Sequence, residues 1–180
     1  MRKKFVAANW KMNLHWNEAL TLFTSLVETE QQSDWSNVEV GVFPPFIYSR
    51  HMYEVAQNYK SEMIIGAQNC AATENGAFTG EVSVSMLSEI GLTSVIVGHS
   101  ERRDYFCENG NVLVEKLKLA INARLRAVYC CGEHLEDRQS GNHQNIIASQ
   151  LKEELFSDLT IVNFLRKSSS FKNSARSLPI

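Results

Sequence analysis

The segment "VIVGHSERR" at residues 95–103 gives the clearest indication of the fold, because an apolar run leads directly into polar and charged side chains. Its first three residues are β-branched, as is typical of a buried strand, and Gly98 ends the run. Ser100 then predicts a helix N-cap, and Glu101 would interact favourably with the positive end of that helix. The segment therefore predicts a strand-to-helix junction, which is where α/β folds gather their functional groups.

Similar apolar runs recur on both sides of this segment. Together with the run at 94–99, they occupy residues 5–9, 38–43, 63–69 and 127–132. Apolar residues at helical spacing fall within 14–31, 111–125 and 143–155. Successive strands begin about 25–33 residues apart, which is the length of a strand–helix–strand unit. The pattern predicts an α/β chain with five strand–helix units and buried parallel strands.

Two architectures fit five such units. A doubly wound open sheet would be complete at 180 residues, whereas a β/α barrel needs eight units and about 250 residues. Length favours the open sheet, but no G-x-G-x-x-G follows the first strand, so the main dinucleotide-binding signature is missing. Polar residues follow four of the five strands, which suits a barrel that brings all its strand ends around one mouth. These residues are Asn9 and Lys11, Gln68 and Asn69, His99 and Glu101, and Cys130 and Glu133.

The composition is that of an ordinary globular domain, with 44% hydrophobic residues and a net charge of −2. This charge gives no reason to expect nucleic acid or an anionic membrane as a partner. No apolar run approaches the roughly 20 residues of a membrane span, and the run from Phe5 to Ala8 is too short for a signal peptide. The sequence therefore predicts a cytoplasmic protein.

The four cysteines have neither disulfide-framework nor zinc-ribbon spacing, which suits a reducing compartment. A metal site built from Cys130, Cys131 and His134 is disfavoured, because neighbouring residues of a strand point to opposite faces. No metal or cofactor is expected.

The junction residues also suggest a chemistry. A neutral His99 at a helix N-terminus can donate a hydrogen bond to a carbonyl oxygen, and Lys11 can attract an anionic substrate that Asn9 orients. The loop at 69–83 is long and carries an isolated Phe78, which suggests an anchor for a second subunit. From spacing alone, a capping turn and ordinary surface loops explain these residues somewhat better.

Five segments together change this balance. They are "ANWKMN" at 8–13, "AQNC" at 67–70, "NGAFTGE" at 75–81, "VGHSERR" at 97–103 and "CGEHLEDR" at 131–138. In order and spacing they resemble triose-phosphate isomerase, and the similarity runs from the first strand to about Lys167. "GHSERR" together with "NWKMN" is highly specific for this family.

The resemblance implies a (β/α)₈ barrel that interconverts glyceraldehyde 3-phosphate and dihydroxyacetone phosphate through an enediol, without a cofactor, as in glycolysis and gluconeogenesis. It also implies a homodimer. By position, the resemblance makes Asn9 and Lys11 substrate-binding and makes Lys11, His99 and Glu101 catalytic. Cys130 corresponds to a buried cysteine beside the active site, and Thr79 with Phe78 lies on the loop that enters the other subunit. The family is a standard example of a neutral catalytic histidine.

The end of the chain departs from the family. We find no segment like the Glu-Pro-Val-Trp that carries the family's catalytic base, and no glycine-rich phosphate loops after it. Residues 168–180, "SSSFKNSARSLPI", stand where the sixth strand is expected. The sequence therefore predicts the N-terminal portion of a barrel at 1–167, about five of eight units, and a disordered non-family tail at 168–180. The expected activity of the chain alone is negligible, and the alternative is a non-catalytic homologue or dimer partner.

Overall fold

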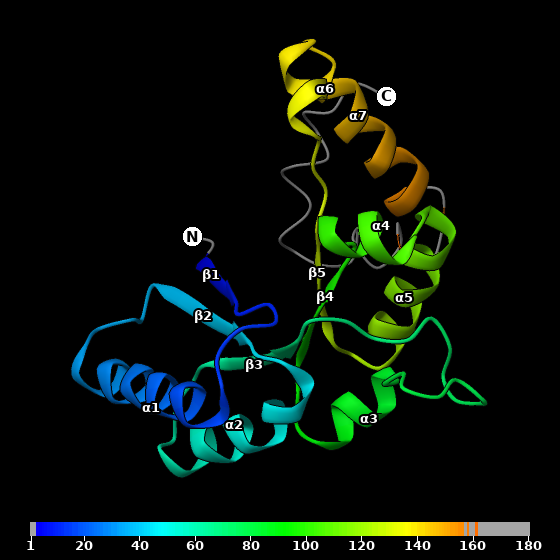
Figure 1. The fold of residues 1–180 in the computed structure, drawn as a ribbon. Coiled ribbons are helices and arrows are strands. Elements are labelled where there is room, and N and C mark those ends of the chain that lie inside the picture. The colour runs from blue at the N-terminus through cyan, green and yellow to red at the C-terminus, as the bar shows by residue number, and fades with distance from the viewer. Residues whose placement is uncertain (1–2, 157, 159–160, 162–180) are drawn as a thin grey trace.

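A computed structural model describes residues 3–156, 158 and 161. Its sheet has five parallel strands in the order β1-β2-β3-β4-β5. The strands are β1 (Lys4–Asn9), β2 (Val38–Phe43), β3 (Ile64–Ala67), β4 (Ser94–Val97) and β5 (Arg126–Tyr129). The helices between and after the strands are α1 (Trp16–Gln32), α2 (Phe46–Asn58), α3 (Val84–Glu89), α4 (Ser100–Phe106), α5 (Gly110–Asn122), α6 (Leu135–Gln139) and α7 (His143–Gln150). A π-helix, η1 (Leu151–Leu155), follows α7. Figure 1 shows the strands curving through the molecule with helices outside them.

The sheet is strongly curled, as contacts across its concave face show. The Arg126 guanidinium on β5 lies 2.8 Å from Glu39 Oε2 on β2 and 5.0 Å from the Phe5 ring centroid on β1. In a flat sheet, neighbouring strands lie about 4.8 Å apart, so the two edge strands would be separated by about 19 Å. The five strands therefore form a half-barrel, and the predicted truncated (β/α)₈ architecture of about five units is confirmed.

Glycines inside the curl make room for Phe43. A Cβ atom on Gly66 of β3 would lie 2.2 Å from the Phe43 ring, and one on Gly41 would lie 2.8 Å from the Phe5 ring and 3.1 Å from the Phe43 ring. Phe43 itself is fully buried. Because close-packed interiors do not absorb an overlap of this size cheaply, the two glycines are required by packing.

The prediction of buried strands holds at the centre of the sheet and fails at its edge. All four residues of β4 are buried, whereas none of β1 is buried and half of its residues are exposed, with Val6 at 54%. The physical reason is position, because β1 and β5 are the two edges of the described sheet and each has a neighbour on one side only. An apolar run gives no sign of which strand will stand at an edge.

The predicted helices form with small shifts in their ends. The pattern at 14–31 becomes α1 at 16–32, and Ala19, Phe23 and Val27 pack into the core at the predicted spacing. The pattern at 143–155 becomes α7 followed by η1. None of the helices in the described part of the chain has the length and apolar character of a membrane span. The predicted boundary at 167/168 and the tail lie outside the described residues.

Candidate active site

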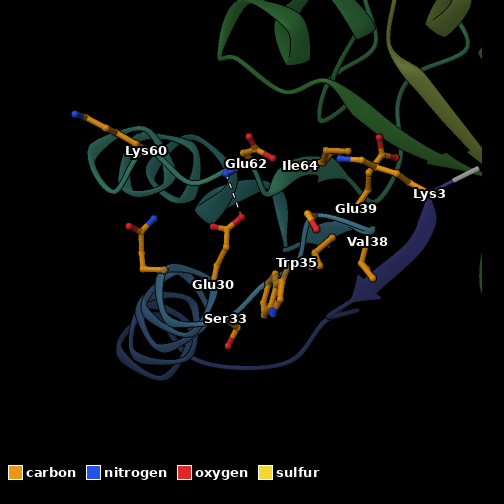
Figure 2. Close-up of a pocket in the computed structure, with 12 residues that line it drawn as sticks. Lys3, Glu30, Ser33, Trp35, Val38, Glu39, Lys60, Glu62 and Ile64 are labelled. Atoms are coloured by element: carbon orange, nitrogen blue, oxygen red, sulfur yellow. Dashed lines mark hydrogen bonds between the residues drawn. The ribbon is translucent and has the colours of Figure 1, made fainter.

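A cavity of about 380 Å³ opens near the amino ends of β2 and β3, among Trp35, Glu30, Glu39 and Glu62 (Figure 2). None of Asn9, Lys11, His99 and Glu101 lines it. In parallel α/β folds the functional groups stand at the carboxyl ends of the strands, so we place the candidate site there and not in this cavity.

The loop after β1 holds Lys11 in an unusual backbone conformation. Lys11 has φ +54°, a left-handed value that few residues other than glycine adopt. Its N–H donates to Asn9 Oδ1 at 2.9 Å, and its carbonyl accepts from Gln68 Nε2 at 2.9 Å. Gln68 also donates to the Phe43 carbonyl at 2.8 Å. Asn9 and Gln68 thus fix Lys11 from two sides, and the strain is typical of functional loops.

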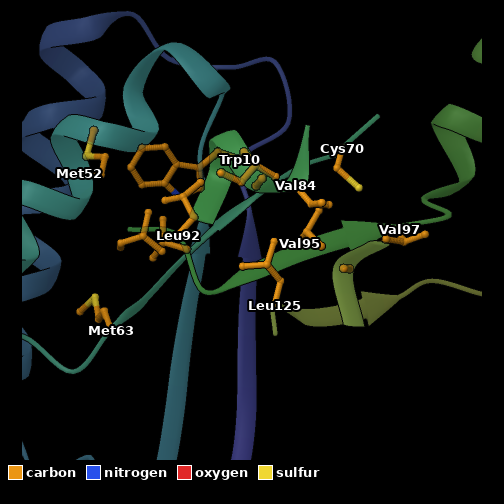
Figure 3. Packing of buried hydrophobic residues seen from close by; sticks show 14 of the residues in the cluster. Trp10, Met52, Met63, Cys70, Val84, Leu92, Val95, Val97 and Leu125 are labelled. Carbon is orange, nitrogen blue, oxygen red and sulfur yellow. The ribbon is translucent and has the colours of Figure 1, made fainter. Parts of the chain in front are cut away.

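Below this loop the chain is anchored in the core. Trp10 is buried among Met52, Val84, Leu92 and Val95, as Figure 3 shows. The Trp10 N–H donates to the Phe43 carbonyl at 3.1 Å, which extends the β1–β2 pairing by one residue. The residue beside Lys11 is therefore immobilised, although Lys11 itself is exposed.

Lys11 reaches α4 through an ion pair with Glu101. Lys11 Nζ lies 2.7 Å from Glu101 Oε1, and the two side chains are 49% and 44% exposed. The hydrogen bond from Lys11 lowers the pKa of the Glu101 carboxyl, with a smaller contribution from the charge of Lys11. The pair brings together residues ninety positions apart in the sequence.

His99 is the N-cap of α4, which corrects the prediction that Ser100 would be. The His99 Nδ1 atom accepts a hydrogen bond from the Glu101 backbone N–H at 3.3 Å. Ser100 becomes the first helical residue instead, because the His99 carbonyl already accepts from the Arg102 and Arg103 N–H groups and the His99 imidazole accepts from the Glu101 N–H. When Nδ1 accepts this hydrogen bond, a neutral ring carries its proton on Nε2, where it can be donated. The same Nδ1 atom also lies 3.5 Å from Glu101 Oε2.

Cys130 and Glu133 follow β5 at the same end of the sheet. Cys130 is half-buried, less than the resemblance implied, and burial raises the pKa of its thiol. Glu133 Oε1 lies 2.6 Å from Arg138 Nη2, and the Arg138 hydrogen bond lowers the pKa of the Glu133 carboxyl. Among the described residues, no group of three His, Cys, Asp or Glu side chains is arranged to hold a metal ion.

The loop between β3 and α3 projects from the same end. Its base is fixed by the Ala71 N–H, which donates to the Val82 carbonyl at 2.8 Å, and by Asn69 Oδ1, which accepts from the buried Lys116 Nζ at 2.7 Å. Phe78 near its tip is 52% exposed, and Thr79 beside it is also exposed. The predicted isolated aromatic on a protruding loop is therefore present.

A family model described as "Triosephosphate isomerase" matches residues 4–163 of this chain. The chain belongs to the triosephosphate isomerase family. It is 42% identical over 157 residues to the triosephosphate isomerase of Porphyromonas gingivalis (strain W83), covering 87% of this chain and 61% of that protein. The protein of the same name from Cytophaga hutchinsonii is 39% identical over 156 residues, with the same coverage. The corresponding Rhodococcus jostii protein is 38% identical over 154 residues, or 86% of this chain and 59% of that protein.

The chain therefore spans about three fifths of the length of the isomerases that it matches. For a member of this family, the structure brings Asn9, Lys11, His99 and Glu101 together at the carboxyl ends of β1 and β4. Their individual roles stay predictions.

Two residues that lie beside these groups had no role in the sequence-based prediction of the site. Arg103 is largely buried and hydrogen-bonded to the Gly98 carbonyl directly before His99. Its partner, Glu154, is buried as well and comes from η1. The pairing of two residues fifty-one positions apart left no local signal in the sequence.

Proposed function

We propose that this chain carries the carbonyl-polarising part of a triose-phosphate isomerase site, for the interconversion of glyceraldehyde 3-phosphate and dihydroxyacetone phosphate through an enediol. The observation that supports this best is the hydrogen bond from the Glu101 N–H to His99 Nδ1, at 3.3 Å. It leaves Nε2–H as the donor of a neutral imidazole, which can stabilise negative charge on a substrate oxygen without giving up a full proton.

The neighbouring groups complete this role. Lys11, half-exposed and already paired with a carboxylate, can exchange Glu101 for the anionic substrate and can stabilise the enediolate charge. Asn9 fixes the Lys11 backbone, and its amide lies on the same rim to orient the substrate. Glu101 holds Lys11 near the site when no substrate is bound. The reaction needs no electron transfer, so these groups require no cofactor.

The reaction also needs a base that removes a proton from the carbon beside the carbonyl. The two glutamates nearest the site in sequence, Glu101 and Glu133, are each paired with a cation that lowers the pKa of the carboxyl. A lowered pKa makes a carboxylate a weaker base, and loss of a general base costs about 10²–10⁴ in rate. We therefore propose that the 180-residue polypeptide alone turns over triose phosphates negligibly.

A coupled isomerase assay on the purified polypeptide tests the activity directly. We expect a rate at background, with dihydroxyacetone phosphate still perturbing the NMR signals of His99. Turnover within about 100-fold of a typical enzyme median of about 10 s⁻¹ would contradict the proposed inactivity. If His99 does not respond to the ligand at millimolar concentration, the proposed substrate is wrong.

A non-catalytic dimer partner is the second candidate, and the exposed Phe78 supports it. An aromatic side chain on a protruding loop is a suitable anchor for a pocket on a second subunit of the same family. Mixing this chain with a full-length isomerase should then lower the activity of that enzyme through mixed dimers. The variant Phe78→Ser should abolish the effect, while Ser85→Ala in α3 serves as a matched control.

We also propose that 1–167 is one barrel portion and 168–180 a separate non-family segment, and that the protein acts in the cytoplasm. The four cysteines, Cys70, Cys107, Cys130 and Cys131, are all free thiols, which fits a reducing compartment.

A further inference from the structure

Arg103 ties together the carboxyl ends of β4 and β5, although the proposed chemistry does not use it. Its Nε donates to the Gly98 carbonyl at 2.8 Å, and its Nη2 donates to the Cys130 carbonyl at 3.0 Å. These two carbonyls directly follow β4 and β5. A single guanidinium therefore bridges two neighbouring strand ends, one of which leads straight into His99.

Gly98 makes this bridge possible. Its φ is +79°, and a Cβ atom there would lie 2.9 Å from Arg103 Nη2 and 3.1 Å from the Cys130 carbonyl oxygen. Only glycine combines the left-handed turn with so close an approach of the guanidinium. Gly98, the residue before His99, therefore leaves the space that the Arg103 guanidinium occupies.

Among the described residues, the counter-charge of the largely buried guanidinium is Glu154. Glu154 accepts from Nη1 at 2.8 Å and from Nη2 at 2.9 Å, and the Arg103 and Glu154 side chains are only 17% and 7% exposed. The Tyr129 hydroxyl also donates to Glu154 Oε2. Burial alone would lower the pKa of the Arg103 guanidinium, but the hydrogen bonds with Glu154 and Tyr129 outweigh it and raise the pKa. Arg103 therefore stays charged in its buried position.

Glu154 reaches Arg103 from the π-helix η1. Its neighbour Glu153 is exposed and accepts from the Ser149 hydroxyl, at 2.6 Å. One of two adjacent glutamates is thus directed inward and the other outward. π-Helical turns are rare and are frequently found at functional sites.

From these contacts we propose that Glu154 is a positioning residue for His99, acting through Arg103 and the Gly98 carbonyl. The guanidinium holds the peptide that joins Gly98 to His99, while the Glu101 N–H holds the imidazole from the other side. Without its counter-charge the guanidinium turns toward water, the Gly98–His99 peptide is released, and the imidazole loses its fixed tautomer. The proposal rests on the proposed function, because that function requires Nε2–H to face a substrate carbonyl.

The test is ¹⁵N NMR of the histidine side chains in the full 180-residue chain, with His99 identified by the loss of its signals in His99→Gln. In the wild-type chain we expect the Nε2–H tautomer of His99 to dominate. In Glu154→Gln we expect the Nδ1–H tautomer to rise about threefold, the change that loss of one weak hydrogen bond produces. Glu154→Asp, which restores the charge, should recover most of the wild-type pattern.

Two further variants keep the test decisive. Glu153→Gln, the matched control on the same turn, should leave His99 unchanged. If Glu154→Gln does not fold, the double variant Arg103→Leu with Glu154→Leu removes both buried charges, and it should fold with the same altered His99 signals. Unchanged His99 tautomers in a folded Glu154→Gln or double variant would overturn the proposal. A wild-type His99 that ignores dihydroxyacetone phosphate would instead count against the proposed function, and the tautomer comparison would still stand.

Discussion

Helix α4 supplies one member to each of two ion pairs that have nearly the same length and opposite surroundings. Lys11–Glu101 measures 2.7 Å and is about half exposed, whereas Arg103–Glu154 measures 2.8 Å and is largely buried. An exposed pair is weakened by water and by salt, so its partners exchange at little cost. A buried pair adds little over an apolar contact, but losing one partner leaves an uncompensated charge in the interior.

In the proposed site, this difference would separate the groups that respond to a substrate from the contacts that hold the strand ends in place. Lys11 stands in solvent and can leave Glu101 for an anionic ligand without exposing a buried charge. Arg103 is enclosed and hydrogen-bonded to the Gly98 and Cys130 carbonyls, so it fixes the two strand ends beside the site. An ion pair between a cation and a carboxylate can therefore be exchangeable at the surface, as for Lys11–Glu101, and rigid in the interior, as for Arg103–Glu154.

The largest effect is expected from breaking the buried pair. Glu154→Ala should lower the free energy of unfolding by about 3–5 kcal/mol, because the Arg103 guanidinium loses its counter-charge. Urea unfolding followed by circular dichroism measures the change. The double variant with leucine at both Arg103 and Glu154 should recover most of the loss. If Glu154→Ala is as stable as the wild-type chain, the buried and exposed pairs do not differ in their effect on stability.

A smaller, opposite change is expected at the end of the helix that carries both pairs. Cys107 caps α4 with φ +54°, a left-handed value that costs a residue other than glycine about 1–2 kcal/mol. Cys107→Gly should therefore raise the free energy of unfolding by about 1 kcal/mol. Asn at this position should give an intermediate gain. If either variant is less stable than the wild-type chain, the strain argument is wrong.

The Lys11–Glu101 pair should be detectable through the pKa of the Glu101 carboxyl. Lys11 lowers the folded-state pKa of Glu101, so its pairing stabilises the folded chain above the unfolded pKa, and this contribution is lost as pH falls through the folded pKa. We expect Lys11→Met to raise the Glu101 pKa toward its ordinary value, as measured by carboxyl ¹³C NMR across the acid range. Lys152→Met, which changes an exposed lysine of η1, should leave it unchanged.

The smallest effect is expected from removing the exposed carboxylate. Glu101→Gln should leave the urea midpoint almost unchanged, and any difference should vanish in about 1 M salt, because screening removes what remains of the interaction. The same unfolding measurement at low and high salt checks this. A destabilisation comparable with that of Glu154→Ala would show that exposure does not distinguish the two pairs.

The strand–helix order was predictable because apolar runs and helical spacing are local properties. The run at 38–43 became β2 with the predicted ends, and the spacing of Ala19, Phe23 and Val27 identified the buried face of α1. The positions of Lys11, His99 and Glu101 just past their strands were predictable for the same reason, and their roles stay predictions. The exposure of Val6 was not predictable, since an edge strand and a central strand share the same apolar pattern.

By itself, the sequence determined the family, the five strand–helix units and the polar residues at their junctions, because neighbouring residues encode these features. Only the tertiary structure decided that His99 caps α4, that Glu101 reaches Lys11 and that Glu154 neutralises Arg103. The two ion pairs join residues from distant segments, and the curl of the sheet brings those segments within hydrogen-bonding distance, whereas the His99 cap is a local contact that depends on the backbone geometry after β4. Burial then determines how much each contact matters, and burial belongs to the folded chain as a whole.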